Sequence, residues 1–277
     1  MTPTRRRYNL PLLIGGALVS LIAATAVLAP VLAPHDPTAI DPPGRLLPAG
    51  PGHPLGTDRL GRDILSRILY GGRVAVIVGV VAVSIGAGAG TSIGLLSGYR
   101  AGRVDAVLMR AIDGLMAFPS LLLAIMVVAV LGPGHIQTMI AIGVVLIPVF
   151  ARLSRAQTLA VRGQEFVLAA RALGAKDVFI VTSHILPNIA GPLLIQATVA
   201  FSGAVLAEAA LSYLGLGTQP PTPSWGGMLL EARDVLFVRP WMAVWPGAAI
   251  AFTVLGWNLM GDGLRDLLDP RLRQGQR

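Results

Sequence analysis

Long apolar runs alternate with short polar segments along most of this chain, and this pattern is the first guide to its structure. The runs lie at residues 10–33, 74–96, 115–131, 136–151, 189–216 and 241–260. A helix needs about 20 mostly apolar residues to cross the hydrocarbon layer of a bilayer. Four runs meet that length, whereas residues 115–131 are marginal and residues 136–151 are short. We therefore predict an all-α, polytopic membrane protein with about six transmembrane helices.

The composition agrees with this prediction and narrows the function. Hydrophobic residues make up 54% of the chain and charged residues 13%, with a mean hydropathy of +0.70. The absence of cysteine excludes disulfides and thiol chemistry. The net charge of +8 fits a membrane protein with basic residues on its cytoplasmic side. We expect no nucleic-acid binding, because no basic face carries interleaved aromatic residues.

The distribution of basic residues predicts an orientation. With six spans, both termini and the loop at 161–188 lie on one side, which holds 15 of the 22 Lys and Arg residues. The side richer in basic residues faces the cytoplasm. The expected divisions are a cytoplasmic tail at 1–9, a first transmembrane helix at 10–33, an extracytoplasmic connector with an amphipathic helix at 34–73, a core transmembrane domain at 74–262 that includes the cytoplasmic loop at 161–188, and a cytoplasmic tail at 263–277.

A cleaved secretory signal is the alternative for the N-terminus. Three arginines at residues 5–7 precede the apolar run, and Ala24, Thr25 and Ala26 resemble a cleavage site. The apolar run continues to residue 33, however, which exceeds the 7–15 residues of a typical signal core. This length favours a retained span.

Residues 53–73 combine apolar and charged positions at helical spacing. Leu60, Ile64 and Ile68 recur at steps of four, and Thr57 or Asp58 can cap a helix start. The other faces carry Arg59, Arg62, Asp63, Ser66 and Arg67. This pattern predicts an amphipathic helix in the membrane interface. It could serve as a topological anchor, or as a gate or receptor-docking element.

The second apolar run carries a regular series of glycines. Gly86, Gly90, Gly94 and Gly98 recur at every fourth position. On a helix they form one stripe that lets another backbone approach closely. We expect helix packing within the chain there, with a subunit interface as the alternative.

The segment 165–188, EFVLAARALGAKDVFIVTSHILPN, has polar and charged residues spread through it, although it lies between apolar runs. It is therefore expected in water between two spans. Its small alanines allow close approach, Gly174 permits a sharp turn, and Pro187 is expected to end the unit. Such an element suits docking by a soluble protein that moves the spans. Phe166, Leu173 and Phe179 are expected to pack within the hinge.

Motifs for catalysis or for binding of ATP are missing from the sequence. A phosphate-binding loop needs glycines followed by Lys and then Ser or Thr, but Lys176, the single lysine, precedes Asp177. The four histidines, His35, His53, His135 and His184, show no metal-ligand spacing. We therefore expect no catalytic residue, no metal site and no enzymatic activity in this chain.

Glu208 is the carboxylate that lies well inside a predicted span. Placing a charge there costs at least about 2.5 kcal/mol, so the side chain should face the bundle interior, a water path or a partner. We consider a translocation-pathway role and a hydrogen-bonded interhelical role.

The segment 165–188 resembles the cytoplasmic loop of binding-protein-dependent ABC importer permeases. That signature reads Glu-Ala-Ala, three residues, Gly, nine residues, then Ile-x-Leu-Pro; Ala169, Ala170, Gly174, Leu186 and Pro187 hold its spacing. Leu168 and His184 depart from it, as in the variant of the dipeptide, oligopeptide and nickel importers. Residues 54–73 and 208–229 are similar to segments of the second permease subunit of those systems.

The resemblance implies the type I importer permease fold in a bacterial or archaeal plasma membrane, with both termini cytoplasmic. It implies a homologous second permease, two ATPases that bind ATP and magnesium, an extracytoplasmic substrate-binding protein, and peptide as the substrate. The loop residues that would couple to the ATPases are Glu165, Ala169, Ala170, Gly174, Ala175, Lys176, Asp177 and Pro187. The alternatives are a nickel-chelate or other small-solute importer and, from another class, a channel subunit that works without ATP.

Overall fold

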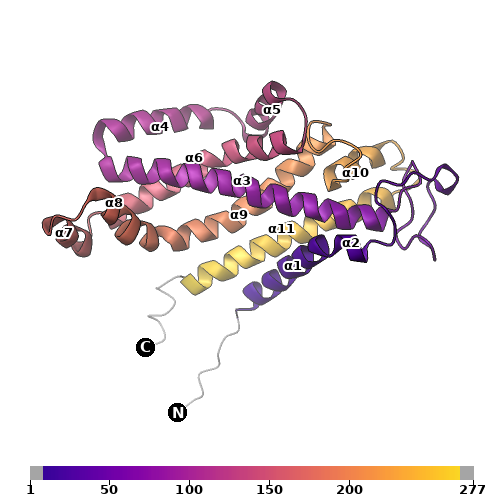
Figure 1. The fold of residues 1–277 in the computed structure, drawn as a ribbon, viewed down its shortest axis with the longest axis horizontal. Helices are drawn as coiled ribbons and strands as arrows, with labels where there is room; N and C mark the ends of the chain where they lie inside the picture. The colour runs from indigo at the N-terminus through magenta and orange to yellow at the C-terminus, as the bar shows by residue number, and fades with distance from the viewer. Residues whose placement is uncertain (1–8, 269–277) are drawn as a thin grey trace, which may run out of the picture.

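The computed structural model describes residues 9–268, whose longest helices run roughly along one axis (Figure 1). The elements are α1 (Leu10–Val27), α2 (Ala29–Leu32), a 3-10 turn (Pro42–Gly44), α3 (Ile64–Arg100), α4 (Gly102–Met116), α5 (Ser120–Leu131), α6 (His135–Val161), α7 (Glu165–Ala172), α8 (Asp177–Phe179), a π-helical segment (Ile180–Ile185), α9 (Leu186–Tyr213), α10 (Trp225–Arg233) and α11 (Trp241–Leu268). Five helical segments are long and apolar enough to cross a membrane, and α4 with α5 can form a sixth, bent by 90°. The prediction of an all-α protein with about six spans is confirmed.

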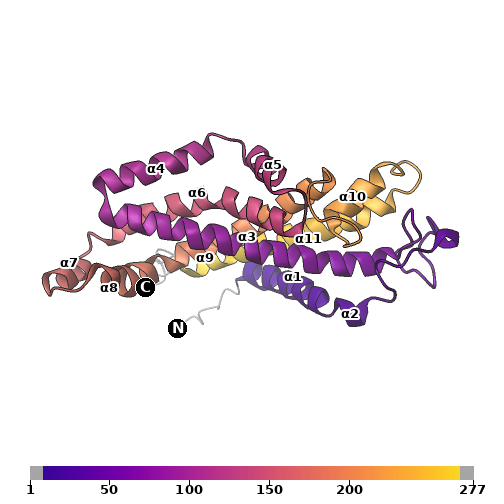
Figure 2. The ribbon, with the colours of Figure 1, turned by 45° about the horizontal axis from the view of Figure 1, so that its top comes forward.

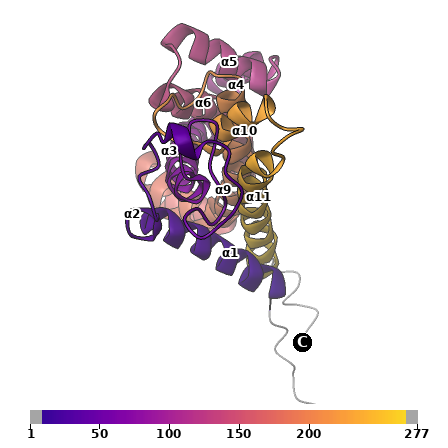
Figure 3. The ribbon, with the colours of Figure 1, turned by 90° about the vertical axis from the view of Figure 1, so that its right-hand side faces the viewer.

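Different segments lie at the two ends of the helix bundle. The α7–α8 loop lies at one end, and the connector before α3 lies with α10 at the other (Figures 1 and 2). Asn9 Nδ2 donates to the Gly263 carbonyl oxygen at 2.7 Å, so α1 begins beside the last turns of α11, on the side toward α7 and α8. Seen along the bundle, α1 occupies one edge and α4 and α5 the opposite edge (Figure 3).

The bounds predicted for the amphipathic helix before the second span are wrong. One helix, α3, runs without a break for 37 residues, and the segment before Ile64 forms turns. Gly56 and Gly61 have φ of +83° and +81°, which a right-handed helix cannot accommodate. The cap is Asp63, whose Oδ2 accepts a hydrogen bond from the Ser66 N–H at 2.7 Å, in place of Thr57 or Asp58.

The later spans also differ from the apolar runs. α5 has only 12 residues, and α4 supplies the other half of the bent pair. α6 extends the short run at 136–151 to 27 residues by including its polar flanks. Helix α11 continues to Leu268, so the expected tail begins as helix, whereas residues 1–8 and 269–277 lie outside the described part of the chain.

Pro187 does not end the loop, contrary to expectation. The helical path continues from Asp177 to Tyr213 through the π-helical segment. Pro187 sits in the first turn of α9, where a missing N–H is tolerated. The wider π turn just before it lets the Leu186 N–H reach the Val181 carbonyl oxygen, so the backbone remains hydrogen-bonded up to the proline.

The glycine stripe of α3 packs against α6 within the same chain. All four of its glycines are buried. A Cβ added at Gly90 would lie 2.7 Å from the Phe150 Cβ, and one at Gly98 would lie 2.8 Å from the Thr158 Cβ. Real Cβ atoms do not come this close, so the two helices touch along their backbones. The stripe therefore packs against another helix of the same chain, as the glycine spacing predicts.

A buried ion network occupies the end opposite α7. Arg62 Nε donates to Asp58 Oδ2 at 2.6 Å, Arg67 also donates to Asp58 Oδ2, and both arginines donate to Glu231 of α10 at 2.6–3.1 Å. Arg62 and Arg67, two of the charged residues on the polar faces of the predicted amphipathic helix, are therefore buried between the connector, α3 and α10. This network fixes α10 to the start of α3.

We expect Gly90→Ala to destabilise the fold and Gly88→Ala to leave it unchanged or slightly more stable. The added methyl at Gly90 overpacks the α3–α6 contact, which costs about 1–3 kcal/mol. A Cβ at Gly88 meets no atom within 4 Å, so only the gain in helix propensity acts there. Thermal unfolding of the purified chain in detergent measures both, and equal midpoints for the two variants would contradict the packing.

We expect Asp58→Asn to lower the free energy of unfolding by about 3–5 kcal/mol, because it leaves two buried guanidinium groups short of a partner. The matched control is Asp234→Asn. Arg59 pairs with Asp234 at 2.6 Å and lowers its pKa, but both side chains are about half exposed, and ion pairs screened by water contribute little to stability. Denaturant titration compares the two variants, and a similar loss from both would contradict the buried network.

Candidate functional site: the α7–α8 loop

The α7–α8 loop is packed firmly onto the ends of two long helices. Val167, Ile180, Ile185 and Ile189 are fully buried in one apolar cluster. Tyr99 at the end of α3 and Val161 at the end of α6 complete this cluster. A displacement of the loop must therefore move α3, α6 and α9 with it, because close-packed side chains transmit strain.

A Schellman turn joins α7 to α8 at the predicted glycine. The Ala175 N–H donates to the Ala170 carbonyl oxygen at 3.1 Å, and the Gly174 N–H donates to that of Arg171 at 3.0 Å. Gly174 has φ of +81°, a conformation that costs other residues energy. The two short helices therefore meet at a fixed angle.

Polar contacts tie the loop to the end of α3. The Tyr99 hydroxyl donates to Asp177 Oδ1 at 2.7 Å, and the Arg171 guanidinium lies over the Tyr99 ring, 5.4 Å from its centroid. Arg162 Nη1 donates to the Gly98 carbonyl oxygen at 2.9 Å. Sequence reasoning missed Tyr99, which lies 66 positions before the loop residue Glu165.

The outer face of the loop is apolar. Leu173, at the turn, is 88% exposed, and Phe166, Leu168, Val178 and Phe179 are exposed as well. The expectation that Phe166, Leu173 and Phe179 pack within the hinge is therefore wrong, although both phenylalanine rings contact His184. Several large apolar residues exposed within one short loop, here among exposed charged residues, are typical of a protein-binding site.

The predicted coupling residues occupy two different faces. Ala170 and Ala175 are half-buried against the apolar cluster and hold the turn together. The exposed ones are Glu165, Ala169, Gly174, Lys176, Asp177 and Pro187. The small residue Ala169 therefore lies on the outer side of α7 and leaves room for a partner to approach.

Glu208 lies inside α9, away from the loop. Its side chain is buried, with the residue 2% exposed, and its Oε1 accepts hydrogen bonds from the Ser212 and Thr218 hydroxyls at 2.7 and 3.3 Å. The carboxyl group therefore joins α9 to the segment that follows it. Both hydrogen bonds stay within α9 and the segment that follows it, so this geometry favours a buried, hydrogen-bonded role over an exposed position on a pathway.

An apolar groove of about 440 Å³ opens between α5, α6 and α9. It is lined by Leu121, Ala124, Val145, Leu146, Gly203 and Leu206, among others. Its lining comes from α5, α6 and α9, which belong to the candidate membrane spans. It offers a surface for another transmembrane helix or for a passing solute.

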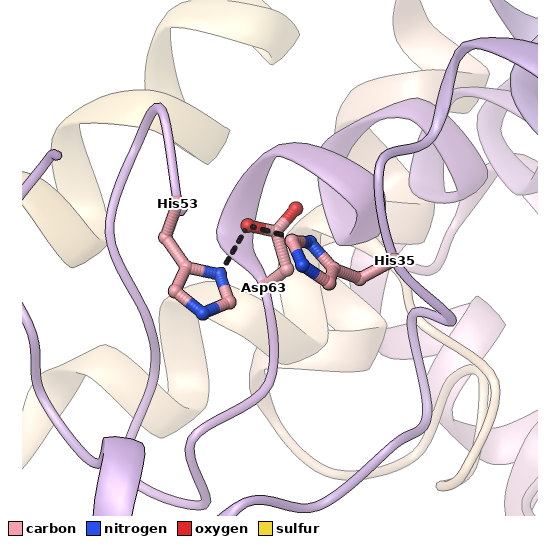
Figure 4. Close-up of side chains that lie close together, drawn as sticks. All are labelled: His35, His53 and Asp63. Carbon is pink, nitrogen blue, oxygen red and sulfur yellow. Dashed lines mark hydrogen bonds and ion pairs between the residues drawn. The ribbon is translucent and has the colours of Figure 1, made fainter. Parts of the chain in front are cut away.

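One group of side chains that could hold a metal ion comes together in the described residues, although the histidine spacing in the sequence did not predict it. His35, His53 and Asp63 each place a ligand atom within 4.8 Å of the others, at the end of the bundle opposite the loop (Figure 4). Their spacing in the sequence gave no sign of this, because the connector folds back on itself between them.

Comparisons with known proteins agree with this architecture. Residues 90–274 match the family model described as binding-protein-dependent transport system inner membrane component. The chain is 44% identical to the dipeptide transport system permease protein DppC of Alkalihalophilus pseudofirmus, over 93% of this chain and 86% of that protein. It is 45% identical to the di/tripeptide transport system permease protein DppC of Pseudomonas aeruginosa, over 94% and 88% of the two chains.

A further relative is the glutathione transport system permease protein GsiD of Pectobacterium atrosepticum, 44% identical over 93% of this chain and 86% of that protein. The matched region includes the glycine stripe from Gly90 onward, the α7–α8 loop and all later spans. Together with the five or six helices able to cross a membrane, this match makes the chain a multi-pass membrane protein. It belongs to the family of inner membrane components of binding-protein-dependent transport systems.

Proposed function

We propose that this chain is one of two homologous permease subunits of an ABC importer for short peptides. The observation that carries the proposal is the α7–α8 loop, a rigid unit with an apolar outer face built on the ends of the spans. The relatives named for dipeptide, di/tripeptide and glutathione transport support peptide as the substrate. Two separate ATPase subunits bind ATP and magnesium, and an extracytoplasmic binding protein delivers the peptide.

In this function the loop transfers the motion of the ATPases to the membrane helices. An ATPase subunit covers Leu173 and its exposed neighbours, and its movement acts through Val167, Ile180 and Tyr99 on three spans at once. Nucleotide shifts the permease between inward-facing and outward-facing states only if the ATPase states contact the loop differently. A fixed turn at Gly174 suits this task, because a flexible loop would absorb the motion.

We also propose an orientation, which the excess of basic residues on the side of the loop supports. The loop and both chain ends face the cytoplasm, and the connector with α10 faces the binding protein. The second permease packs beside the groove between α5, α6 and α9, so that the two subunits enclose the peptide pathway between them. Glu208 supports the wall of this pathway from within the chain.

We expect Leu173→Asp to abolish most transport while leaving the fold intact. A central apolar side chain contributes about 2 kcal/mol or more to an interface, so ATPase binding should weaken by roughly thirtyfold or more. Phe237→Asp is the matched control for ATPase binding, because Phe237 is fully exposed but lies between α10 and α11, at the other end of the bundle. Co-purification of the ATPases compares the two variants, and uptake by whole cells measures the effect of Leu173→Asp. Normal uptake by Leu173→Asp would overturn the docking role.

The substrate is tested with the assembled transporter in proteoliposomes. We expect its ATPase rate to rise with the binding protein and a dipeptide, and to stay at the basal rate with a nickel chelate. Stimulation by the nickel chelate alone would favour the alternative small-solute importer. Uptake that continues without ATP would instead favour the channel alternative.

A further inference from the structure

Three polar side chains meet where the connector folds back onto the start of α3 (Figure 4). His35 follows α2, His53 belongs to a tight turn closed by reciprocal backbone hydrogen bonds with Gly50, and Asp63 is the cap of α3. Neither the transport family nor the proposed loop function gives this cluster a role. It lies at the end of the bundle farthest from the α7–α8 loop.

The two oxygens of Asp63 have different tasks. Oδ2 accepts hydrogen bonds from the Ser66 N–H at 2.7 Å and from the Ser66 hydroxyl at 2.8 Å, which completes the helix cap. Oδ1 faces both histidines, with His53 Nδ1 at 2.9 Å and His35 Nδ1 at 3.8 Å. The Asp63 side chain is fully buried, so a negative oxygen is held in place beside two imidazole nitrogens.

These separations suit a small divalent ion. Zinc bonds of about 2.0–2.2 Å in tetrahedral geometry place neighbouring donor atoms roughly 3.4 Å apart. The distances from Asp63 Oδ1 to the two histidine nitrogens, 2.9 and 3.8 Å, lie on either side of that value, and ligand atoms of all three residues lie within 4.8 Å of one another. The two rings already lie together, with centroids 4.6 Å apart and planes 30° from parallel.

An ion could reach the cluster and complete its coordination with water. The His35 side chain is 43% exposed and lines an open cavity of about 620 Å³, together with Asp36, Tyr70 and Pro221. Three protein ligands and one open position are typical of exchangeable zinc sites. Two imidazoles and a carboxylate select a transition-metal ion over Mg²⁺ and Ca²⁺, which prefer sites made only of oxygen ligands.

We propose that His35 Nδ1, His53 Nδ1 and Asp63 Oδ1 form a binding site for a divalent transition-metal ion, with Zn²⁺ as its representative. The bound ion fastens the end of the first span and the connector to the start of α3. It thereby stabilises the surface beside the buried Arg62 and Arg67 network. Metal binding to the folded state alone raises apparent stability.

The test uses the full chain, purified in detergent without a histidine tag and freed of metal with a chelator. Co²⁺ should produce the absorption bands of a four-coordinate site, Zn²⁺ should displace it, and Zn²⁺ should raise the unfolding midpoint. His35→Gln and His53→Gln should each weaken Zn²⁺ binding by more than the roughly 10–100-fold that loss of an outer-shell partner causes. The matched control is His184→Gln, in the loop at the other end, which should bind as the original chain does.

Asp63→Asn separates the metal ligand from the helix cap, because asparagine caps helices as well as aspartate does. This variant should keep the midpoint measured without metal but lose most of the rise caused by Zn²⁺. Mg²⁺ should not shift the midpoint of any variant. The proposal is overturned if the original chain shows no zinc-dependent shift, or if His35→Gln and His53→Gln bind Zn²⁺ as tightly as His184→Gln.

Discussion

The close contact between α3 and α6 is the constraint on which the rest of the molecule depends. Four buried glycines let the two helices touch along residues 86–98 of α3, and the Gly90 and Gly98 positions leave no room for a methyl group. In lipid the hydrophobic effect does not hold helices together, so such backbone packing supplies much of the association energy. The result is a stiff central pair that can carry a force from one end of the bundle to the other.

Each end of this pair is fixed by a different kind of interaction. At one end the apolar cluster around Val167 and Ile180 packs the loop onto Tyr99 and Val161. At the other end a buried ion network joins the start of α3 to α10. Apolar packing leaves the outer face of the loop free to bind a partner. The ion network satisfies charges that the membrane environment would otherwise penalise.

The sequence predicted the features that depend on local pattern. Apolar runs revealed the spans, the four-residue glycine spacing revealed a packing face, and the spacing of Ala169, Ala170, Gly174 and Pro187 revealed the loop. It failed where distant segments decide the outcome. The positive φ of Gly61 keeps residues before Ile64 out of α3, so the helix begins later than predicted. The π turn keeps the backbone hydrogen-bonded up to Pro187, so the helical path continues past this proline. Neither effect has a signal in a hydropathy pattern.

The candidate sites show the same division. Gly174 could be recognised as a turn, because few other residues adopt its conformation. Tyr99 and the burial of Val167 could not, because they depend on how the loop folds back on α3. Leu173 and Phe179 are exposed, contrary to the prediction that they pack within the hinge. In the proposed function this exposed surface binds the ATPase. Likewise, His35, His53 and Asp63 meet only after the connector has folded.

In the proposed function, the α7–α8 loop faces the cytoplasm and an ATPase subunit binds to it. The chain has no cysteine, so Leu173→Cys would introduce a single thiol at the most exposed point of the turn. A membrane-impermeant maleimide should label it in inside-out vesicles stripped of the ATPases, and rebinding of the ATPases should protect it. Labelling in intact cells, or labelling that the ATPases leave unchanged, would contradict the account.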